Sequence, residues 1–218
     1  MLNLLIIIVA TSLLLGLLYC ENKEKRKGLL LTKTLLSSLF IFAVLVQNHP
    51  IPRYFYSLLA GLIFCLCGDV FLALPQKKMF LFGLVSFLLG HLFYIFSFFY
   101  VAQTSQWTWV GSFIVLVISG WVYLWLRPHL GSMNVPVLLY VVVITAMVSG
   151  ACSVLGDPNL KSLGRIMIFA GALSFYFSDL FVARDRFLKN EFFNRLIGLP
   201  MYYMGQFLLA FSVGLLKY

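Results

Sequence analysis

Residues 54–74, YFYSLLAGLIFCLCGDVFLAL, form an apolar run that contains a single charged residue, Asp69. A helix needs roughly 20 apolar residues to cross the hydrocarbon core of a bilayer, and this run has that length. A carboxylate inside such a run is costly, so it is expected to face other helices and to have a function. The run therefore predicts a transmembrane helix with an inward-facing acidic residue near one end.

The same pattern extends over the whole chain. Of 218 residues, 62% are hydrophobic and 11% are charged, whereas a soluble domain carries about 25% charged residues. Apolar runs between charged or proline-containing breaks predict spans near 2–20, 29–46, 54–74, 79–101, 109–126, 136–155, 163–183 and 195–216. We therefore expect an all-α polytopic membrane protein: a single bundle of about eight transmembrane helices over residues 1–218, with no separate soluble domain.

The basic residues predict the orientation of this bundle. Of 16 Lys and Arg residues, eleven lie in the breaks after the first, third, fifth and seventh spans. The other breaks and the C-terminus carry four: Arg53, Lys161, Arg165 and Lys217. By the positive-inside rule, the odd-numbered breaks are cytoplasmic and both termini are extracytoplasmic. The net charge of +9 thus fits a lipid bilayer and not a nucleic-acid partner, and the compact chain favours a bacterial inner membrane over the endoplasmic reticulum.

A weak internal repeat suggests two similar halves. A shift of 110 residues aligns four identical pairs in the third span of each half: Gly61 with Gly171, Asp69 with Asp179, Phe71 with Phe181 and Ala73 with Ala183. Because four spans separate the pairs, the halves would be related by an axis along the membrane normal. The sequence thus predicts a four-plus-four internal repeat.

Two carboxyl groups are predicted to lie at one depth in the membrane. Of seven acidic residues, only Asp69 and Asp179 have apolar sequence on both sides. Asp69 lies six residues before Pro75 and Asp179 five before Arg184. At about 1.5 Å per residue, both lie roughly 8–9 Å inside the cytoplasmic boundary, which places a candidate site toward that leaflet. Other polar residues on the spans are Lys33, His91, Tyr94, Tyr140, Tyr202 and Gln206.

These residues are compatible with some chemistries and exclude others. The three histidines, His49, His91 and His129, are predicted at different depths and cannot bind one ion, so we expect no metal and no other cofactor. Two carboxyl groups in a low dielectric do not easily both ionise, so one can donate a proton while the other acts as base. This favours general acid–base hydrolysis. The alternatives are a proton-coupled carrier of a small amphiphile and a structural role in which each carboxylate locks the bundle.

Longer motifs carry a resemblance to a known family. They are Cys67-Gly-Asp69-Val-Phe71, Gly83 through Tyr94, Val135 through Tyr140, Gly171 through Phe187, and Tyr202-Tyr203-Met-Gly-Gln206. In this order they resemble the lysoplasmalogenase (YhhN-like) family of multi-pass membrane proteins. The family usually has Lys-Pro where this chain has Lys33-Thr34.

The resemblance implies hydrolysis of the vinyl-ether bond of lysoplasmalogens, which are lysophospholipids. The products would be a fatty aldehyde and glycerophosphocholine or glycerophosphoethanolamine. Our hypothesis assigns the acid and base to Asp69 and Asp179, and the headgroup phosphate to Lys33 with Arg184 or Arg186. The side chains expected to position the acids and water are His91, Tyr94, Tyr140, Tyr202 and Gln206.

Overall fold

The described part of the chain is built from helices. The computed structural model describes residues 1–216, which form no β-strand. Its α-helices are α1 (Leu2–Asn22), α2 (Arg26–Leu45), α3 (Pro52–Ala73), α4 (Lys77–Val101), α5 (Gln106–Leu130), α6 (Asn134–Gly156), α7 (Ser162–Ala183) and α8 (Phe192–Leu215). A 3-10 turn (Gly131–Met133) joins α5 to α6, and a π-helical turn (Arg184–Leu188) follows α7.

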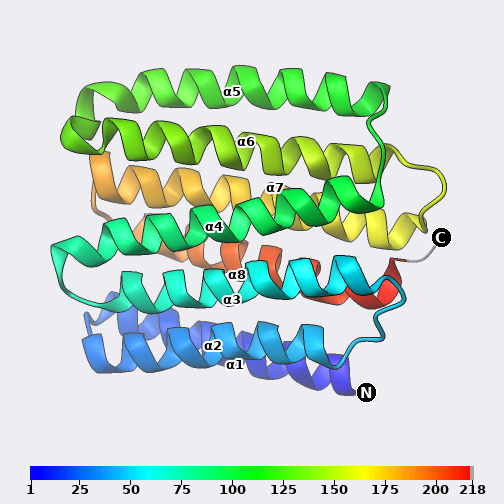
Figure 1. Cartoon of the computed structure of the whole chain (residues 1–218). Coiled ribbons are helices and arrows are strands. Elements are labelled where there is room, and N and C mark those ends of the chain that lie inside the picture. Colours follow the sequence, from blue (N-terminus) through cyan, green and yellow to red (C-terminus); the bar gives the residue numbers. More distant parts are fainter. Residues whose placement is uncertain (217–218) are drawn as a thin grey trace.

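The helices are long and apolar enough to cross a membrane. Seven continuous helical stretches meet this test by length and composition. One of them, Gln106–Gly156, consists of α5 and α6, which fold back on each other as an antiparallel pair (Figure 1). The predicted eight-helix integral membrane bundle is therefore confirmed.

The distribution of polar and apolar side chains in the bundle is the reverse of that in a water-soluble protein. On α5, Trp109 is 71% exposed and Phe113 is 69% exposed, whereas the side chains of Asp69, His91 and Gln206 are at most 2% exposed. Large apolar residues on the outside and polar residues on the inside are unfavourable in water. Lipid contact makes the same arrangement favourable, because only polar groups need protein partners there.

Local sequence signals define several helix ends. Pro52 is the first residue of α3, where its missing N–H costs nothing. Ser105 and Thr108 form a capping box at the start of α5. Gly131 has a φ of 51° directly after α5, a conformation that glycine adopts easily. The helices that result have 20–25 residues, about 30–38 Å of length.

One end of the bundle collects the connections after α1, α3, α5 and α7, all on the left in Figure 1. We call it the basic end, because eleven Lys and Arg residues lie in these connections or in the adjoining helix ends. The N-terminus and the other connections lie at the opposite end (Figure 1). Lys217, which was counted with the opposite end, lies outside the described residues.

The two halves of the chain pack in the same way. α3 packs along α4 and α7 packs along α8, while α2 contacts α8 and α6 contacts α4. The backbones of α3 and α4, and those of α7 and α8, approach each other closely. A Cβ atom on Gly61 would lie 3.0 Å from the carbonyl oxygen of Gly90, and a Cβ atom on Gly171 would lie 3.0 Å from the carbonyl oxygen of Gly205. Small residues allow this close approach in membranes. The four-plus-four repeat expected from the sequence thus has a counterpart in the packing.

Candidate active site

A cavity of about 660 Å³ lies at the basic end, and all eight helices contribute to its lining. Its volume is in the range of about 300–1,000 Å³ that is typical of small-molecule sites. Asp69 of α3 and Asp179 of α7 both line it. Two residues 110 positions apart in the sequence therefore present their carboxyl groups to the same cavity.

Asp69 is held by hydroxyl groups from two other helices. Its Oδ2 atom accepts hydrogen bonds from Ser37 Oγ of α2 and from Tyr202 OH of α8, each at 2.6 Å. The positive charge of Lys33, one turn before Ser37, also acts on this carboxylate. Asp69 is only 2% exposed. Its Oδ1 atom has no hydrogen-bond partner among residues 1–216 and is available to the cavity.

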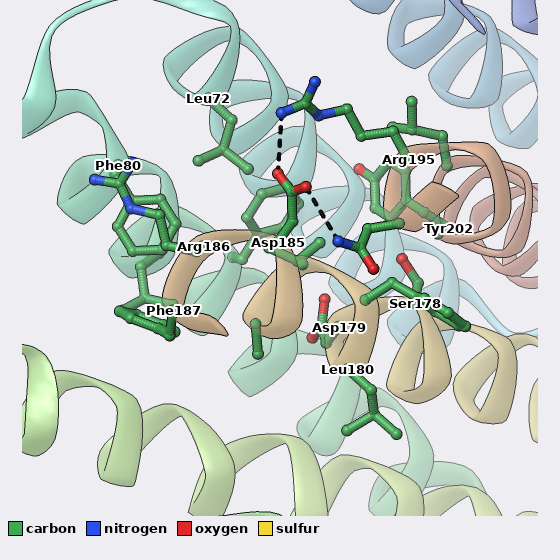
Figure 2. A pocket seen from close by; sticks show the side chains of 18 of the residues that line it. Leu72, Phe80, Ser178, Asp179, Leu180, Asp185, Arg186, Phe187, Arg195 and Tyr202 are labelled. Carbon is green, nitrogen blue, oxygen red and sulfur yellow. Dashed lines mark hydrogen bonds and ion pairs between the residues drawn. The ribbon is translucent and has the colours of Figure 1, made fainter. Parts of the chain in front are cut away.

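Asp179 has a single hydroxyl partner. Its Oδ2 atom accepts a hydrogen bond from Tyr140 OH of α6 at 2.6 Å. Within the described part of the chain, its Oδ1 atom also lacks a partner. Figure 2 shows Asp179 among the side chains that line the pocket. Each carboxyl group thus has one oxygen bonded to a tyrosine and one without a partner among residues 1–216.

The two carboxyl groups do not share a hydrogen bond in the described residues. Aromatic rings form the wall between their tyrosines: Phe175 lies 5.2 Å from Tyr202 and 6.1 Å from Phe87, measured between ring centroids. The rings are packed edge to face, which fixes their orientation. The two carboxyl groups therefore line different walls of the cavity, Asp69 on the α3 side and Asp179 on the α7 side.

A second polar layer lies behind this aromatic wall. His91 donates from Nδ1 to the Phe87 carbonyl oxygen at 2.6 Å, and its ring packs edge-on against Phe175. Tyr94 OH donates to Gln206 Oε1 at 2.8 Å. His91 Nε2 and Gln206 Nε2 have no partner in the described residues. These three predicted residues are buried, and in the described part of the chain they do not belong to the cavity lining.

The π-helical turn after α7 shapes the mouth of the cavity. Its defining hydrogen bond runs from Lys189 N–H to the Arg184 carbonyl oxygen at 2.8 Å, five residues apart. Arg184 is not part of the described cavity lining, and it donates to Oδ1 of Asn194 at 2.6 Å. Arg186 lines the mouth, with its guanidinium 4.3 Å from the centroid of the Phe80 ring (Figure 2).

A charged network holds the mouth together. Asp185 accepts from Arg195 at 3.2 Å and from the amide of Asn194 at 3.3 Å (Figure 2). Arg195 also lies 3.7 Å from Glu21, so the network joins the ends of α1 and α7 to α8. At the surface nearby, a hydrogen bond from Lys189 lowers the pKa of Glu191. The mouth therefore carries fixed charges of both signs.

The predicted site residues divide into two groups. Those that line the cavity are Lys33, Asp69, Tyr140, Asp179, Arg186 and Tyr202. Those that do not are His91, Tyr94, Arg184 and Gln206.

Sequence reasoning missed three residues. Ser37 bonds to Asp69, and it could have been found because it lies four residues after Lys33 on the same helical face. Asp185 and Arg195 line the mouth, but in the sequence they resemble ordinary loop charges.

Comparisons with known proteins identify relatives of this chain. The profile of the YhhN family matches residues 29–213. A lysoplasmalogenase of Mycobacterium bovis is 31% identical over 169 residues, which are 75% of this chain and 61% of the relative. The lysoplasmalogenase TMEM86A of Bos taurus is 30% identical over 169 residues, 76% of this chain and 67% of the relative. The human TMEM86A is 30% identical over 70% of this chain and 62% of its own length.

The matched region therefore spans about three fifths of the length of the Mycobacterium relative. No solved structure matches the chain.

Proposed function

The chain belongs to the YhhN family, and from this premise we propose that it is a membrane hydrolase that cleaves the vinyl-ether bond of lysoplasmalogens. The products are a fatty aldehyde and glycerophosphocholine or glycerophosphoethanolamine. The relatives named lysoplasmalogenase support the substrate class. The observation that carries the proposal is the cavity that both Asp69 and Asp179 line, each with one oxygen that has no partner among residues 1–216.

The two carboxyl groups supply the acid and the base of the reaction. The protonated carboxyl group gives its proton to the outer vinyl carbon, and the electron pair of the double bond forms the new C–H bond. This leaves an oxocarbenium ion. The ionised carboxylate removes a proton from water as the water oxygen bonds to that cation, giving a hemiacetal. The hemiacetal loses its hydroxyl proton to the first carboxylate, and the second carboxylic acid protonates the departing glycerol oxygen. Both groups then return to their starting states.

The hydrogen bonds suggest which residue has which role. Two hydroxyl donors and the nearby charge of Lys33 stabilise a carboxylate at Asp69. Asp179 has one hydroxyl donor, from Tyr140. We therefore assign the base to Asp69 and the proton donor to Asp179. The contribution of a positioned acid or base is typically 10²- to 10⁴-fold in rate.

Cations at the cavity wall suit the headgroup phosphate. Lys33 is 7% exposed and lines the cavity beside Asp69. Arg186 lines the mouth and has no carboxylate partner among the described residues. A guanidinium can form two parallel hydrogen bonds to phosphate, which fixes the headgroup. Arg184 is already bound to Asn194 and Glu191, so we assign the phosphate to Lys33 and Arg186 and not to Arg184.

The orientation in the membrane is also part of the proposal. The positive-inside rule puts the basic end in the cytoplasm, with both termini on the other side. The cavity then opens at the cytoplasmic leaflet of the membrane, which we take to be a bacterial inner membrane. A lysolipid in that leaflet can present its ether bond to the carboxyl groups without leaving the lipid.

The test compares single variants of the purified protein. Wild type, Asp69→Asn and Asp179→Asn are given a lysoplasmalogen, and aldehyde release is measured. Each variant should lose at least a hundredfold, about 2.7 kcal/mol of activation free energy. Asp157→Asn, in the connection after α6 at the opposite end, is the matched control and should be unaffected. A saturated alkyl-ether lysolipid should not be cleaved, because it has no double bond to protonate.

Two results would refute the assignment. If either aspartate variant keeps activity within a few-fold of wild type, that residue is not the acid or the base. If labelled lipid moves across proteoliposomes without aldehyde release, the protein is a carrier.

A further inference from the structure

The cavity has an apolar side that faces α5, α6 and α7 and reaches from the level of the mouth, at Ala183, past the level of Asp179 to Ile144. We call this side the side arm, and its lining residues are Val122, Leu126, Val137, Val141, Ile144, Leu180 and Ala183. All of these side chains are apolar. Val122, Leu126 and Ile144 are at most 7% exposed, so the side arm is lined by residues of the packed interior.

A hydrogen-bonded bridge closes the far end of the side arm. Thr145 Oγ1 of α6 donates to Ser119 Oγ of α5 at 2.7 Å, and Ser119 Oγ lies 2.9 Å from Tyr176 OH of α7. All three residues are at most 8% exposed. Because the three hydroxyl groups satisfy one another, the bridge offers little to a polar ligand.

The cavity therefore combines three kinds of lining. The mouth is charged, with Arg186, Asp185 and Arg195. The carboxyl groups of Asp69 and Asp179 lie deeper, and the apolar side arm runs beside Asp179 and past it. An amphiphile with a charged head, a reactive bond and a hydrocarbon chain matches these three kinds of lining.

We propose that the side arm binds the first carbons of the alkenyl chain and so places the vinyl-ether bond between the two carboxyl groups. This inference rests on the proposed function, because it assumes that the substrate is a lysolipid. The arm is apolar and therefore suits hydrocarbon, whereas a headgroup would lose its hydration there without gaining partners.

The length of the side arm sets how much chain it holds. On α6, Tyr140 is bonded to Asp179 and Thr145 belongs to the bridge, so the two levels are five residues apart. Five residues of α-helix rise about 7.5 Å. An extended chain advances about 1.3 Å per carbon, since its C–C bonds are about 1.5 Å long. The side arm thus holds about six carbons, and the rest of a longer chain has to lie outside it.

Filling the side arm tests the proposal with the full-length protein. Ile144→Trp places a large ring where the chain is expected, and Val142→Trp adds the same ring to a position that is 59% exposed on the same helix. Aldehyde release is compared for a vinyl-ether lysolipid with a 16-carbon chain and for one with a four-carbon chain. Ile144→Trp should lower the long-to-short activity ratio at least tenfold, and Val142→Trp should leave it within twofold of wild type.

A second measurement does not depend on cleavage. A saturated alkyl lysolipid with a photoreactive diazirine at the fifth chain carbon is bound to the wild-type protein, and labelled peptides are mapped by mass spectrometry. Specific labelling is the part that an excess of unlabelled lysolipid suppresses. It should fall on residues 119–126, 137–144 and 176–183. This measurement stands even if Ile144→Trp fails to fold.

The possible failures can be told apart. A wild type that releases no aldehyde refutes the proposed function, while the labelling still decides where the chain binds. An unchanged long-to-short ratio in a folded Ile144→Trp protein, or competed label on other segments, refutes the side arm as the chain site and leaves the proposed function untouched.

Discussion

Tyr202 provides a sharp test of how the site holds Asp69. The change Tyr202→Phe removes one hydroxyl group and keeps the ring, which packs 5.2 Å from Phe175 and 5.8 Å from Phe87 between centroids. Asp69 Oδ2 then keeps only the hydrogen bond from Ser37. The variant therefore alters the carboxylate while leaving the aromatic wall in place.

The size of the effect follows from the hydrogen bond that is lost. A hydrogen bond to a charged group contributes about 1.5–3 kcal/mol. If Asp69 is the ionised base, loss of the hydrogen bond from Tyr202 should lower kcat about ten- to hundredfold. The assay couples aldehyde release to reduction by NADH, which gives a continuous signal and separates kcat from KM.

A matched control removes the same kind of bond far from the cavity. Tyr54 OH lies 2.7 Å from Ser212 Oγ, and both residues are buried near the opposite end of the bundle. Tyr54→Phe should lower stability by about 1 kcal/mol and leave kcat unchanged. If Tyr202→Phe stays within twofold of wild type, the bond to Asp69 does not support catalysis and the role given to Asp69 is wrong.

Three further predictions concern the mouth and the packing. Arg186→Gln should raise KM about tenfold because a phosphate contact is lost, whereas Arg184→Gln should not change KM; equal KM values would refute the headgroup assignment. Asp185→Asn removes a partly exposed ion pair and should cost less than about 1 kcal/mol, seen as a salt-sensitive fall in Tm; a salt-independent collapse would contradict this. Gly171→Val should destabilise by about 1–3 kcal/mol, because its Cβ would lie 3.0 Å from a backbone oxygen. Gly120→Val, with open space around its Cβ, should leave Tm unchanged, and equal Tm values for the two glycine variants would contradict the close packing of α7 on α8.

The helices and the inward-facing carboxylate were predictable from the sequence. A run of about 20 apolar residues is favourable in lipid as a transmembrane helix, so composition and length located the spans to within a few residues. The direction of Asp69 was also predictable: Gly61 and Cys65 precede it at helical spacing, and all three are buried.

The mouth could not be predicted in the same way. The π-helical turn inserts a wider hydrogen-bonded ring after α7 and changes the helical phase. Regular spacing counted from Asp179 therefore fails for the residues that follow, so Arg184 turns toward Asn194 while Arg186 lines the cavity. The partners of Asp185 are Asn190, Glu191, Asn194 and Arg195, all within ten residues of it. They lie in an irregular connection and the first turn of α8, so they follow no helical spacing in the sequence.

The sequence also could not predict which buried polar residues reach the cavity. His91 and Gln206 are polar and buried, as expected, but they lie outside the cavity lining. Which polar residue of a helix reaches a cavity depends on rings packed in front of it, here Phe87 and Phe175.

The most direct test of the central claim is the activity of the double variant Asp69→Asn, Asp179→Asn beside the two single variants. If the two carboxyl groups act as one acid–base unit, removing the second should cost at most about tenfold more than removing the first, because residues that act together are not additive. Losses that multiply across the pair, or a single variant with near wild-type aldehyde release, would contradict the account.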